Sequence, residues 1–353
     1  MRLNLKIRIF AGMIRRFLIG LLVGYVRMGL SFYFRRMEIH GQENVPATGA
    51  VMIAANHQNS FLDAIIIAAA ISRRLHFLVR ADVFKKPLAA KILRGLNMMP
   101  VFRFRDGWQS LGKNSETFDE VVALFQRKEV LLLFPEGNHS LLRRLRPLSR
   151  GFTKPLAMAL EKNPDQKIFL LPAGLNFSDH KAFRSDASVY FGPPIDVSSF
   201  VREGILDANA LRLRLSDEMK KLVVHIEDIE TYPQIETQLI TDGADFTDPI
   251  TTNDRIAGMF IPPNVISKNG KIRTSKWMDT VFRLLHYPVL MGWHQVRSKI
   301  TDPVFTASLK FVYGIFAFPL YYLIIFSAIF IIAEPLPAFE VIMLMIFSVL
   351  MKK

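Results

Sequence analysis

Residues 50–63 read Ala-Val-Met-Ile-Ala-Ala-Asn-His-Gln-Asn-Ser-Phe-Leu-Asp, an apolar run that ends in a polar turn. The run Ala50–Ala55 has the length and composition of a buried strand, and Ser60–Ile71 after it is typical of a helix. His57 therefore follows a strand directly, and Asp63 lies inside the next helix. Ligands of open parallel sheets bind beyond the carboxyl ends of the strands. This one stretch thus predicts an α/β fold and the place of a site.

Apolar runs and helical patterns alternate along the rest of this region. The strands expected after the first are Leu75–Arg80, Met98–Phe102, Val130–Phe134, Lys167–Asn176 and Ser188–Phe191. The helices expected after Ser60–Ile71 are Lys86–Leu96, Thr117–Arg127 (with Thr117 and Glu120 at capping-box spacing) and Asp207–Ile229. Strands that are apolar throughout indicate burial on both faces. We therefore expect an α/β fold whose central sheet is mostly parallel and flanked by helices.

His57 and Asp63 form the first candidate site. A carboxylate one or two helical turns beyond a histidine can fix its tautomer and stabilise the imidazolium that forms when it takes a proton. The pair predicts a general base, His57, with Asp63 as its orienting partner. The plainer alternative is a structural one, in which Asn56 caps the helix beside a buried, hydrogen-bonded histidine.

The second candidate site is the turn Phe134-Pro135-Glu136-Gly137-Asn138-His139-Ser140, at the end of another apolar strand. A bend at Gly137 would leave backbone N–H groups to face a phosphate. Glu136 could hydrogen-bond a hydroxyl or orient a cation. An ordinary Pro-Glu-Gly turn is the alternative.

The two blocks, in this order, resemble the signature of the PlsC-like glycerolipid acyltransferase superfamily, Asn-His-x-x-x-x-Asp followed by Phe-Pro-Glu-Gly. The resemblance covers roughly residues 40–225. Three more segments are similar to blocks of that family: one ending in a phosphate-binding arginine (Met99–Arg103), a basic-glycine segment (Ser149–Phe152), and a block whose proline shapes the acceptor or acyl site (Leu171–Asn176, with Pro172).

Two departures from the family pattern affect the expected site. Five residues, not four, separate His57 from Asp63, and one extra helical residue would rotate the carboxylate by about 100°. The turn before the helix must therefore absorb it. The longer spacing is similar to that of yeast-type glycerol-3-phosphate acyltransferases, which favours glycerol 3-phosphate as acceptor. Asn138-His139 replaces a common Thr-Arg, and the arginines that could substitute for it are Arg143, Arg144, Arg103 and Arg105.

The resemblance implies an O-acyltransferase of phospholipid biosynthesis. Its donor would be acyl-CoA or acyl-carrier protein, and its acceptor glycerol 3-phosphate or 1-acylglycerol 3-phosphate. No cofactor or metal is implied. The catalytic residues would be His57 and Asp63, and the substrate-binding residues Arg103, Arg105, Glu136, Gly137 and Pro172. The chain has no cysteine, so acyl transfer cannot pass through a cysteine thioester.

Other functions are weighed against this one. A net charge of +14 suits nucleic acid or an anionic membrane, and basic residues that flank apolar helices favour the membrane. A metal hydrolase using His57, Asp63 and His139 lacks a His-x-x-x-His cluster. A non-catalytic membrane scaffold or lipid-transfer protein on the same fold, and acylation of another lysophospholipid, stay open. Nothing in the sequence indicates an oligomeric state.

The ends of the chain predict membrane attachment. Residues 1–36 would form an amphipathic helix that lies on the membrane or, alternatively, packs on the domain; Arg15, Arg16 and Arg27 disfavour a signal peptide or a span. The catalytic domain would be 37–230. Residues 231–310 would hold a surface excursion (241–275) and an interfacial helix (Trp277–Lys299). Residues 311–353 would form a hairpin, with a spanning run Phe311–Ala333 and a second run, 335–351, that spans or re-enters; flanking lysines predict a cytoplasmic catalytic domain.

Overall fold

The computed structural model describes residues 2–102, 112, 114–258, 276–333 and 335–351, with side chains from residue 17 onward. The chain divides into two compact units. One, the sheet unit, comprises Glu38–His180 and Ala187–Lys271. The other, the helical unit, comprises Met1–Met37, Lys181–Asp186 and Ile272–Lys353.

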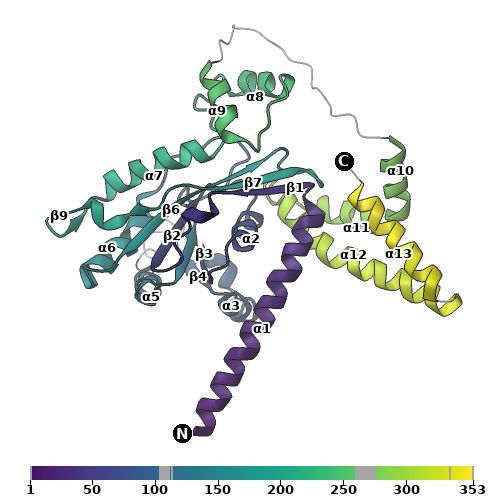
Figure 1. Ribbon diagram of the computed structural model, residues 1–353, viewed down its shortest axis with the longest axis horizontal. Coiled ribbons are helices and arrows are strands. Elements are labelled where there is room, and N and C mark those ends of the chain that lie inside the picture. Colours follow the sequence, from purple (N-terminus) through teal and green to yellow (C-terminus); the bar gives the residue numbers. More distant parts are fainter. Residues whose placement is uncertain (1, 103–111, 113, 259–275, 334, 352–353) are drawn as a thin grey trace. The chain divides into compact units, whose positions relative to one another are not determined.

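The sheet has the strand order β1-β7-β6-β2-β5-β3-β4, with β8 also paired to β6 (Figure 1). Pairs among β6, β2, β5, β3 and β4 are parallel, and β7 and β8 run antiparallel to β6. The expectation of a mostly parallel sheet flanked by helices is confirmed. The strands are β1 (Arg36–His40), β2 (Ala50–Ala55), β3 (Leu75–Arg80), β4 (Met98–Val101), β5 (Val130–Leu133), β6 (Ile168–Phe177), β7 (Asp186–Phe191) and β8 (Ile195–Asp196), with a separate hairpin β9 (Val201–Arg202) and β10 (Ile205–Leu206).

The helices of this unit connect the strands. They are α2 (Phe61–Ala70), α3 (Pro87–Gly95), α5 (Asn114–Gln126), α6 (Thr153–Lys162) and α7 (Ala208–Leu222), with short 3-10 turns η1 (Gln42–Asn44), η2 (Ala81–Phe84), η4 (Arg150–Phe152) and η5 (Val197–Phe200). Alternate side chains of β2 (Ala50, Met52) share one buried cluster with α5, α6 and α7. That cluster is the core on one face of the sheet.

The direction in which successive parallel strands are added across the sheet reverses between β2 and β5. The connection from β2 to β3 runs toward the β4 edge, whereas the connections from β4 to β5 and from β5 to β6 run the other way. Right-handed crossovers therefore place α2 on one face and α5 and α6 on the other. The helices that follow the neighbouring strands β2 and β5 thus leave on opposite faces. Such a switch point is where open α/β sheets hold their ligands.

The helix expected over Asp207–Ile229 is shorter than predicted. Asp207 caps α7 by accepting a hydrogen bond from the Ala210 N–H, and the helix ends at Leu222. The side chain of Asn176 in β6 donates to the Leu222 carbonyl and accepts from the Val224 N–H. A side chain from another strand therefore ends this helix, and local sequence does not record it.

Two other sequence interpretations in this unit missed structure that the fold contains. The helix expected at Thr117 begins at Asn114, and the Thr117 hydroxyl donates to the Pro100 carbonyl instead of capping a helix. The predicted surface excursion contains the carboxyl end of α8 (Tyr232–Thr241) and all of α9 (Pro249–Gly258). These helices share a small buried cluster that includes Ile235, Leu239 and Phe246. Residues 259–275 lie outside the described residues.

The helical unit contains five helices in the described part of the chain: α1 (Arg2–Tyr33), α10 (Lys276–Leu285), α11 (Tyr287–Arg297), α12 (Phe305–Ile332) and α13 (Pro335–Leu350). The single helix expected over Trp277–Lys299 is two helices, because Pro288 begins a new one at its first turn. The carboxyl end of α1 packs on α12, where Tyr33 meets Phe311 edge-on at 5.5 Å between ring centroids. Farther back on α1, Phe17, Leu18 and Leu21 are exposed.

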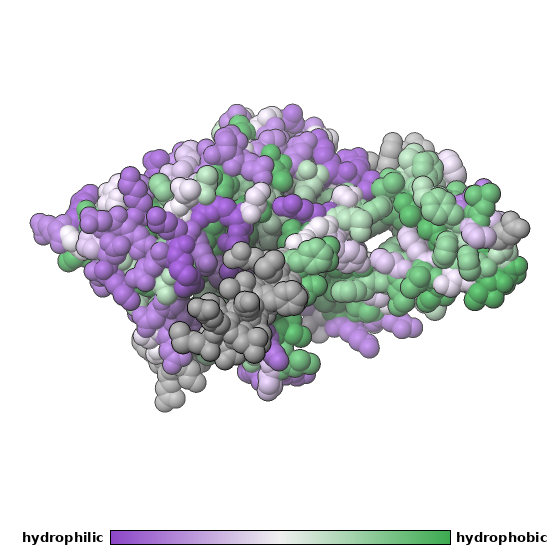
Figure 2. Space-filling view, turned by 60° about the horizontal axis from the view of Figure 1, so that its bottom comes forward, coloured by the Kyte–Doolittle hydropathy of each residue, from purple (hydrophilic) through white to green (hydrophobic). Residues whose placement is uncertain are grey.

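α12 and α13 form a helical hairpin at the end of the chain, with apolar side chains over much of its surface (Figures 1 and 2). By length and composition α12 is long and apolar enough to cross a membrane, and none of its most apolar window is buried. Its 28 residues correspond to about 42 Å. α13 is shorter, at 16 residues.

Candidate functional site

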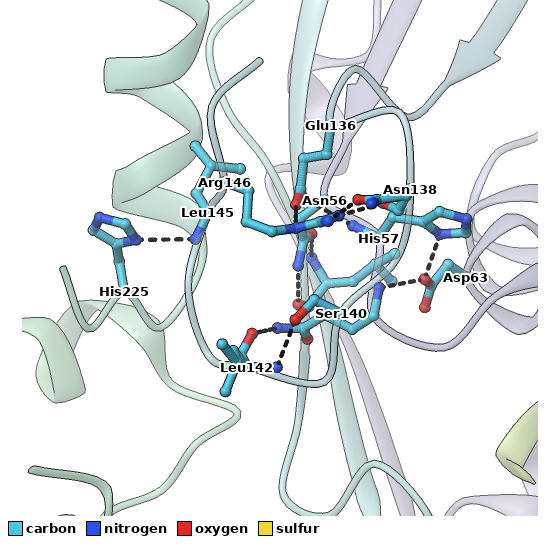
Figure 3. Close-up of polar contacts among 12 residues, drawn as sticks. Asn56, His57, Asp63, Glu136, Asn138, Ser140, Leu142, Leu145, Arg146 and His225 are labelled. Atoms are coloured by element: carbon cyan, nitrogen blue, oxygen red, sulfur yellow. Dashed lines mark hydrogen bonds and ion pairs between the residues drawn. The ribbon is translucent and has the colours of Figure 1, made fainter. Parts of the chain in front are cut away.

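His57 and Asp63 meet at the carboxyl end of β2. The imidazole Nδ1 lies 2.9 Å from Asp63 Oδ2, the Asp63 side chain is fully buried, and the His57 side chain is 17% exposed (Figure 3). The same Oδ2 accepts from the backbone N–H groups of Gln58 and Asn59, each at 2.8 Å. Because a carboxylate accepts at this oxygen, the neutral imidazole carries its proton on Nδ1 and has its lone pair on Nε2.

The turn between them absorbs the extra residue of the motif. Ser60 takes φ 51 and ψ −135, a positive φ that residues other than glycine seldom adopt, and α2 begins at the next residue. This turn brings Asp63, in the first turn of α2, back to the imidazole. A strained non-glycine residue next to polar side chains is a common mark of functional sites.

The plainer alternative had Asn56 as the cap of α2, and it does not cap that helix. Its amide donates to the Leu175 carbonyl and accepts from the Leu175 N–H, at 2.9 and 2.7 Å, and its side chain is buried. These two bonds continue the pairing of β2 with β6 beyond the last strand residue. They fix the point at which the chain turns toward His57.

Glu136 joins the second turn to the first. Its side chain is 2% exposed, Oε1 accepts from the His57 backbone N–H at 3.1 Å, and Oε2 accepts from Arg146 Nε at 2.7 Å. Burial raises the pKa of Glu136, and the Arg146 guanidinium opposes that rise. Both oxygens are thus engaged in holding the two turns together. Glu136 binds the chain around His57, which differs from its predicted contact with substrate.

Arg146 fastens the second turn onto itself. Besides Glu136 it contacts both the side-chain oxygen and the carbonyl of Asn138 (Figure 3). The Ser140 N–H donates to the His57 carbonyl at 3.1 Å, so the two turns also meet through their backbones. The Phe134 ring stacks on the imidazole, with centroids 3.9 Å apart and planes 12° apart.

The expected role of Gly137 as a free N–H donor does not fit its geometry. The Gly137 N–H donates to the Phe134 carbonyl at 3.1 Å, within the turn. Its φ of +75 shows why glycine stands there. Pro172 is buried in β6 opposite Ala54, within the sheet and before the His57 turn. Arg103 and Arg105 lie outside the described residues.

Arg143, a suggested substitute for the phosphate contact, is buried for another purpose. Its guanidinium donates to the Phe177 and Ser178 carbonyls and stacks over the Phe246 ring. Its N–H donates to the Tyr232 hydroxyl. It therefore joins the chain after the second turn to α8 and to the loop between α8 and α9. Desolvation by burial lowers its pKa.

Several residues at the site were not singled out by sequence. Arg146, ten residues beyond Glu136, carries no motif that marks it. Gln58 donates to the Leu142 carbonyl at 3.0 Å and contacts His180 at 3.2 Å, which brings a distant loop to the His57 turn. The only sequence signal for Gln58 is its place beside His57. The His139 ring lies edge-on to the imidazole at 5.7 Å.

Part of the chain is similar to known proteins. Residues 36–175 match the Acyltransferase family model. Glycerol-3-phosphate O-acyltransferase 2 of Saccharomyces cerevisiae is 27% identical over 132 residues, which cover 37% of this chain and 18% of that protein. Glycerol-3-phosphate O-acyltransferase 1 of the same yeast is 35% identical over 65 residues, covering 18% and 9%. An uncharacterized acyltransferase of Schizosaccharomyces pombe is 21% identical over 252 residues, covering 48% and 37%.

The matched segments thus span less than two-fifths of the length of each relative. Among solved structures, the chain is similar to PlsC, the 1-acyl-sn-glycerophosphate (LPA) acyltransferase of Thermotoga maritima, with 16% identity and a TM-score of 0.44 over 59% of this chain and 79% of that one. The family match begins in β1, ends in β6 and contains both strand-end turns. The segment 36–175 is thus similar to the Acyltransferase family, and it includes the part of the chain that carries both turns.

Proposed function

We propose that this chain transfers a fatty acyl group from a thioester to the hydroxyl of a glycerophosphate acceptor, with His57 as general base. The observation that carries the proposal is the 2.9 Å contact between His57 Nδ1 and the buried Asp63 at the switch point of the sheet. A partly exposed imidazole with an oriented, unprotonated Nε2 is suited to take a proton from a hydroxyl.

The reaction takes place in two steps at one carbonyl carbon. The acceptor oxygen attacks the thioester carbonyl while His57 Nε2 takes the hydroxyl proton. The tetrahedral intermediate then expels the thiolate, which receives that proton from the imidazolium, giving an ester and a free thiol. Asp63 stabilises the imidazolium in between, because its carboxylate lies within hydrogen-bond distance of Nδ1. General-base assistance of this kind contributes about 10²–10⁴-fold.

The acceptor is proposed to carry a phosphate. Arg103 and Arg105 follow β4, and an arginine fork meets phosphate oxygens two at a time. The long His57–Asp63 spacing and the names of the two yeast relatives support glycerol 3-phosphate as the first acceptor to test, before its 1-acyl form. The donor is acyl-CoA or acyl-carrier protein, both anionic and suited to a chain of net charge +14.

The chain is proposed to work at a membrane. The apolar helix α12 and the hairpin that it forms with α13 would anchor it, and the lysines around the hairpin would keep both ends and the sheet unit on the cytoplasmic side. Residues 1–36 would add an interfacial segment, for which the exposed Phe17, Leu18 and Leu21 supply apolar contacts.

The test is an acyl-transfer assay on the full chain in membranes, with both acceptors and both donors and products identified by mass. We expect His57→Ala to abolish ester formation. His40→Ala is the matched control, because His40 lies in β1 and stacks on Tyr190 away from the site. Unaltered activity in His57→Ala would refute the proposed mechanism. A wild-type chain that binds membranes and forms no ester would indicate a scaffold or lipid-transfer protein.

A further inference from the structure

The segment that leaves the carboxyl end of β3 exposes several large apolar side chains. In η2 and α3, three large apolar side chains lie in water: Val83 at 43%, Leu88 at 73% and Ile92 at 55% exposure. Leu88 and Ile92 are four residues apart on α3 and so share one face of the helix. Isolated apolar residues are common on surfaces, but a run of three on one short segment indicates a contact.

Basic side chains surround these apolar residues. Residues 80–96 contain five lysines and arginines and one acidic residue, Asp82. Asp82 pairs with Arg80, and Arg94 lies 3.8 Å from Glu120 of α5. The other three basic residues, Lys85, Lys86 and Lys91, are exposed, and none of them has an ion pair within the part of the chain that the structure describes.

The position of this segment within the sheet unit is also informative. β3 is parallel to β5 and adjacent to it, and β5 leads to Glu136. Val83 and Leu88 therefore come soon after the carboxyl end of β3, at the same edge of the sheet as the turns that carry His57 and Glu136. A surface bound here would lie along the edge that holds the site.

We propose that η2 and α3 form a docking surface for an anionic lipid bilayer, with Val83, Leu88 and Ile92 inserted at the headgroup level and Lys85, Lys86 and Lys91 on the lipid phosphates. Apolar residues on one helical face with lysines beside them are the composition of helices that lie in a membrane interface. The ammonium group of a lysine can contact lipid headgroups while its aliphatic chain packs against apolar surface. An anionic bilayer satisfies both features at once. The surface and its test do not depend on the proposed chemistry.

The absence of cysteine from the chain permits a direct test. Leu88→Cys and, separately, Ile92→Cys would be labelled with a nitroxide in the full chain reconstituted in vesicles of phosphatidylcholine with phosphatidylglycerol. Ile205→Cys is the matched control, since Ile205 is 74% exposed in the β9–β10 hairpin of the same unit. Collision rates with a water-soluble and a lipid-soluble relaxation agent report the depth of each label.

We expect the labels at 88 and 92 to collide at least about threefold less with the aqueous agent than the label at 205, and more with the lipid-soluble one. Replacing phosphatidylglycerol by phosphatidylcholine should reduce that protection, because the lysines lose their anionic partners. Labels at 88 and 92 as water-accessible as that at 205 would overturn the proposal. So would protection that appears only on adding an acidic carrier protein.

Discussion

The turns after β2 and β5 leave neighbouring strands at the same edge of the sheet, yet they are built in opposite ways. The β2 turn holds Ser60 at a positive φ and keeps the His57 ring 17% exposed. The β5 turn uses glycine at its positive-φ position, Gly137, and buries its acidic residue, Glu136, to 2%. One turn leaves an imidazole partly exposed, and the other has both oxygens of its carboxylate engaged.

On the proposed mechanism, this difference separates a catalytic role from a positioning role. Asp63 and Glu136 are both buried carboxylates beside His57, but Asp63 contacts the ring and Glu136 contacts the backbone. In the proposed reaction the imidazole takes a proton at Nε2 and returns it, and Asp63 acts on that ring, whereas the His57 backbone N–H takes no part. We therefore expect Asp63 to affect proton transfer by His57 and Glu136 to affect the position of the imidazole.

The largest effect is expected for Asp63→Asn. The amide oxygen can still accept from the Gln58 and Asn59 N–H groups, but the negative charge that stabilises the imidazolium is lost. We expect kcat to fall by about 10²–10⁴-fold with KM for the acceptor little changed. Steady-state kinetics on membranes would measure this. An equal loss in Glu136→Gln would erase the distinction between the two carboxylates.

A smaller effect is expected for Arg146→Met. The Arg146 charge holds down the pKa of Glu136 against the burial that raises it, so its removal raises that pKa further. Glu136 then takes up a proton at higher pH. We therefore expect the acid limb of the plot of kcat against pH to shift to higher pH, with a loss of about tenfold in kcat. Arg146→Lys, which keeps the charge, should restore the limb but not the full rate. An unmoved acid limb in Arg146→Met would contradict this.

The far end of the β5 turn is fastened by His225, whose Nδ1 accepts from the Leu145 N–H at 3.0 Å (Figure 3). Burial lowers the pKa of His225 from 6.5 to about 4. The unfolded chain therefore binds the proton first as pH falls, so the stability linked to this group is complete above pH 6.5 and lost toward pH 4. Allowing for solvent screening, we expect a loss of about 2 kcal/mol across that window. Denaturant unfolding of wild type and His225→Gln would test it, since the variant should lack this slope.

The smallest effects concern the two positive-φ residues, and they should have opposite signs. Ser60→Gly relieves backbone strain and should raise stability by about 1 kcal/mol after the greater entropy of the unfolded glycine is subtracted. Gly137→Ala should lower it by about 1–2 kcal/mol, although a Cβ there would meet no atom within 4 Å. Thermal unfolding of both variants would measure the pair. Equal signs would show that the two turns do not differ in strain.

The sheet was predictable because its strands carry their own signal. β2 and β5 are buried at every position, so continuous apolar runs mark them without reference to any partner. The end of α7 and the start of α5 could not be predicted from sequence, because they depend on hydrogen bonds of Asn176 and Asn114 to residues outside those helices. Asn114 holds both backbone groups of Phe102, twelve residues away. Such contacts leave no periodic trace.

The sequence by itself determined the order of strands β2 to β7 and of helices α2, α3, α5 and α7, the two motif turns and the family they resemble, since these depend on apolar periodicity and on residues close in the chain. Tertiary structure alone decided that the longer spacing still brings Asp63 to His57, because it does so through the conformation of Ser60. It also decided that Glu136 and Arg146 support the His57 backbone and that Arg143 is buried against Phe246. The physical reason is separation along the chain: each of these contacts forms only when the folded sheet has brought the carboxyl ends of its strands together.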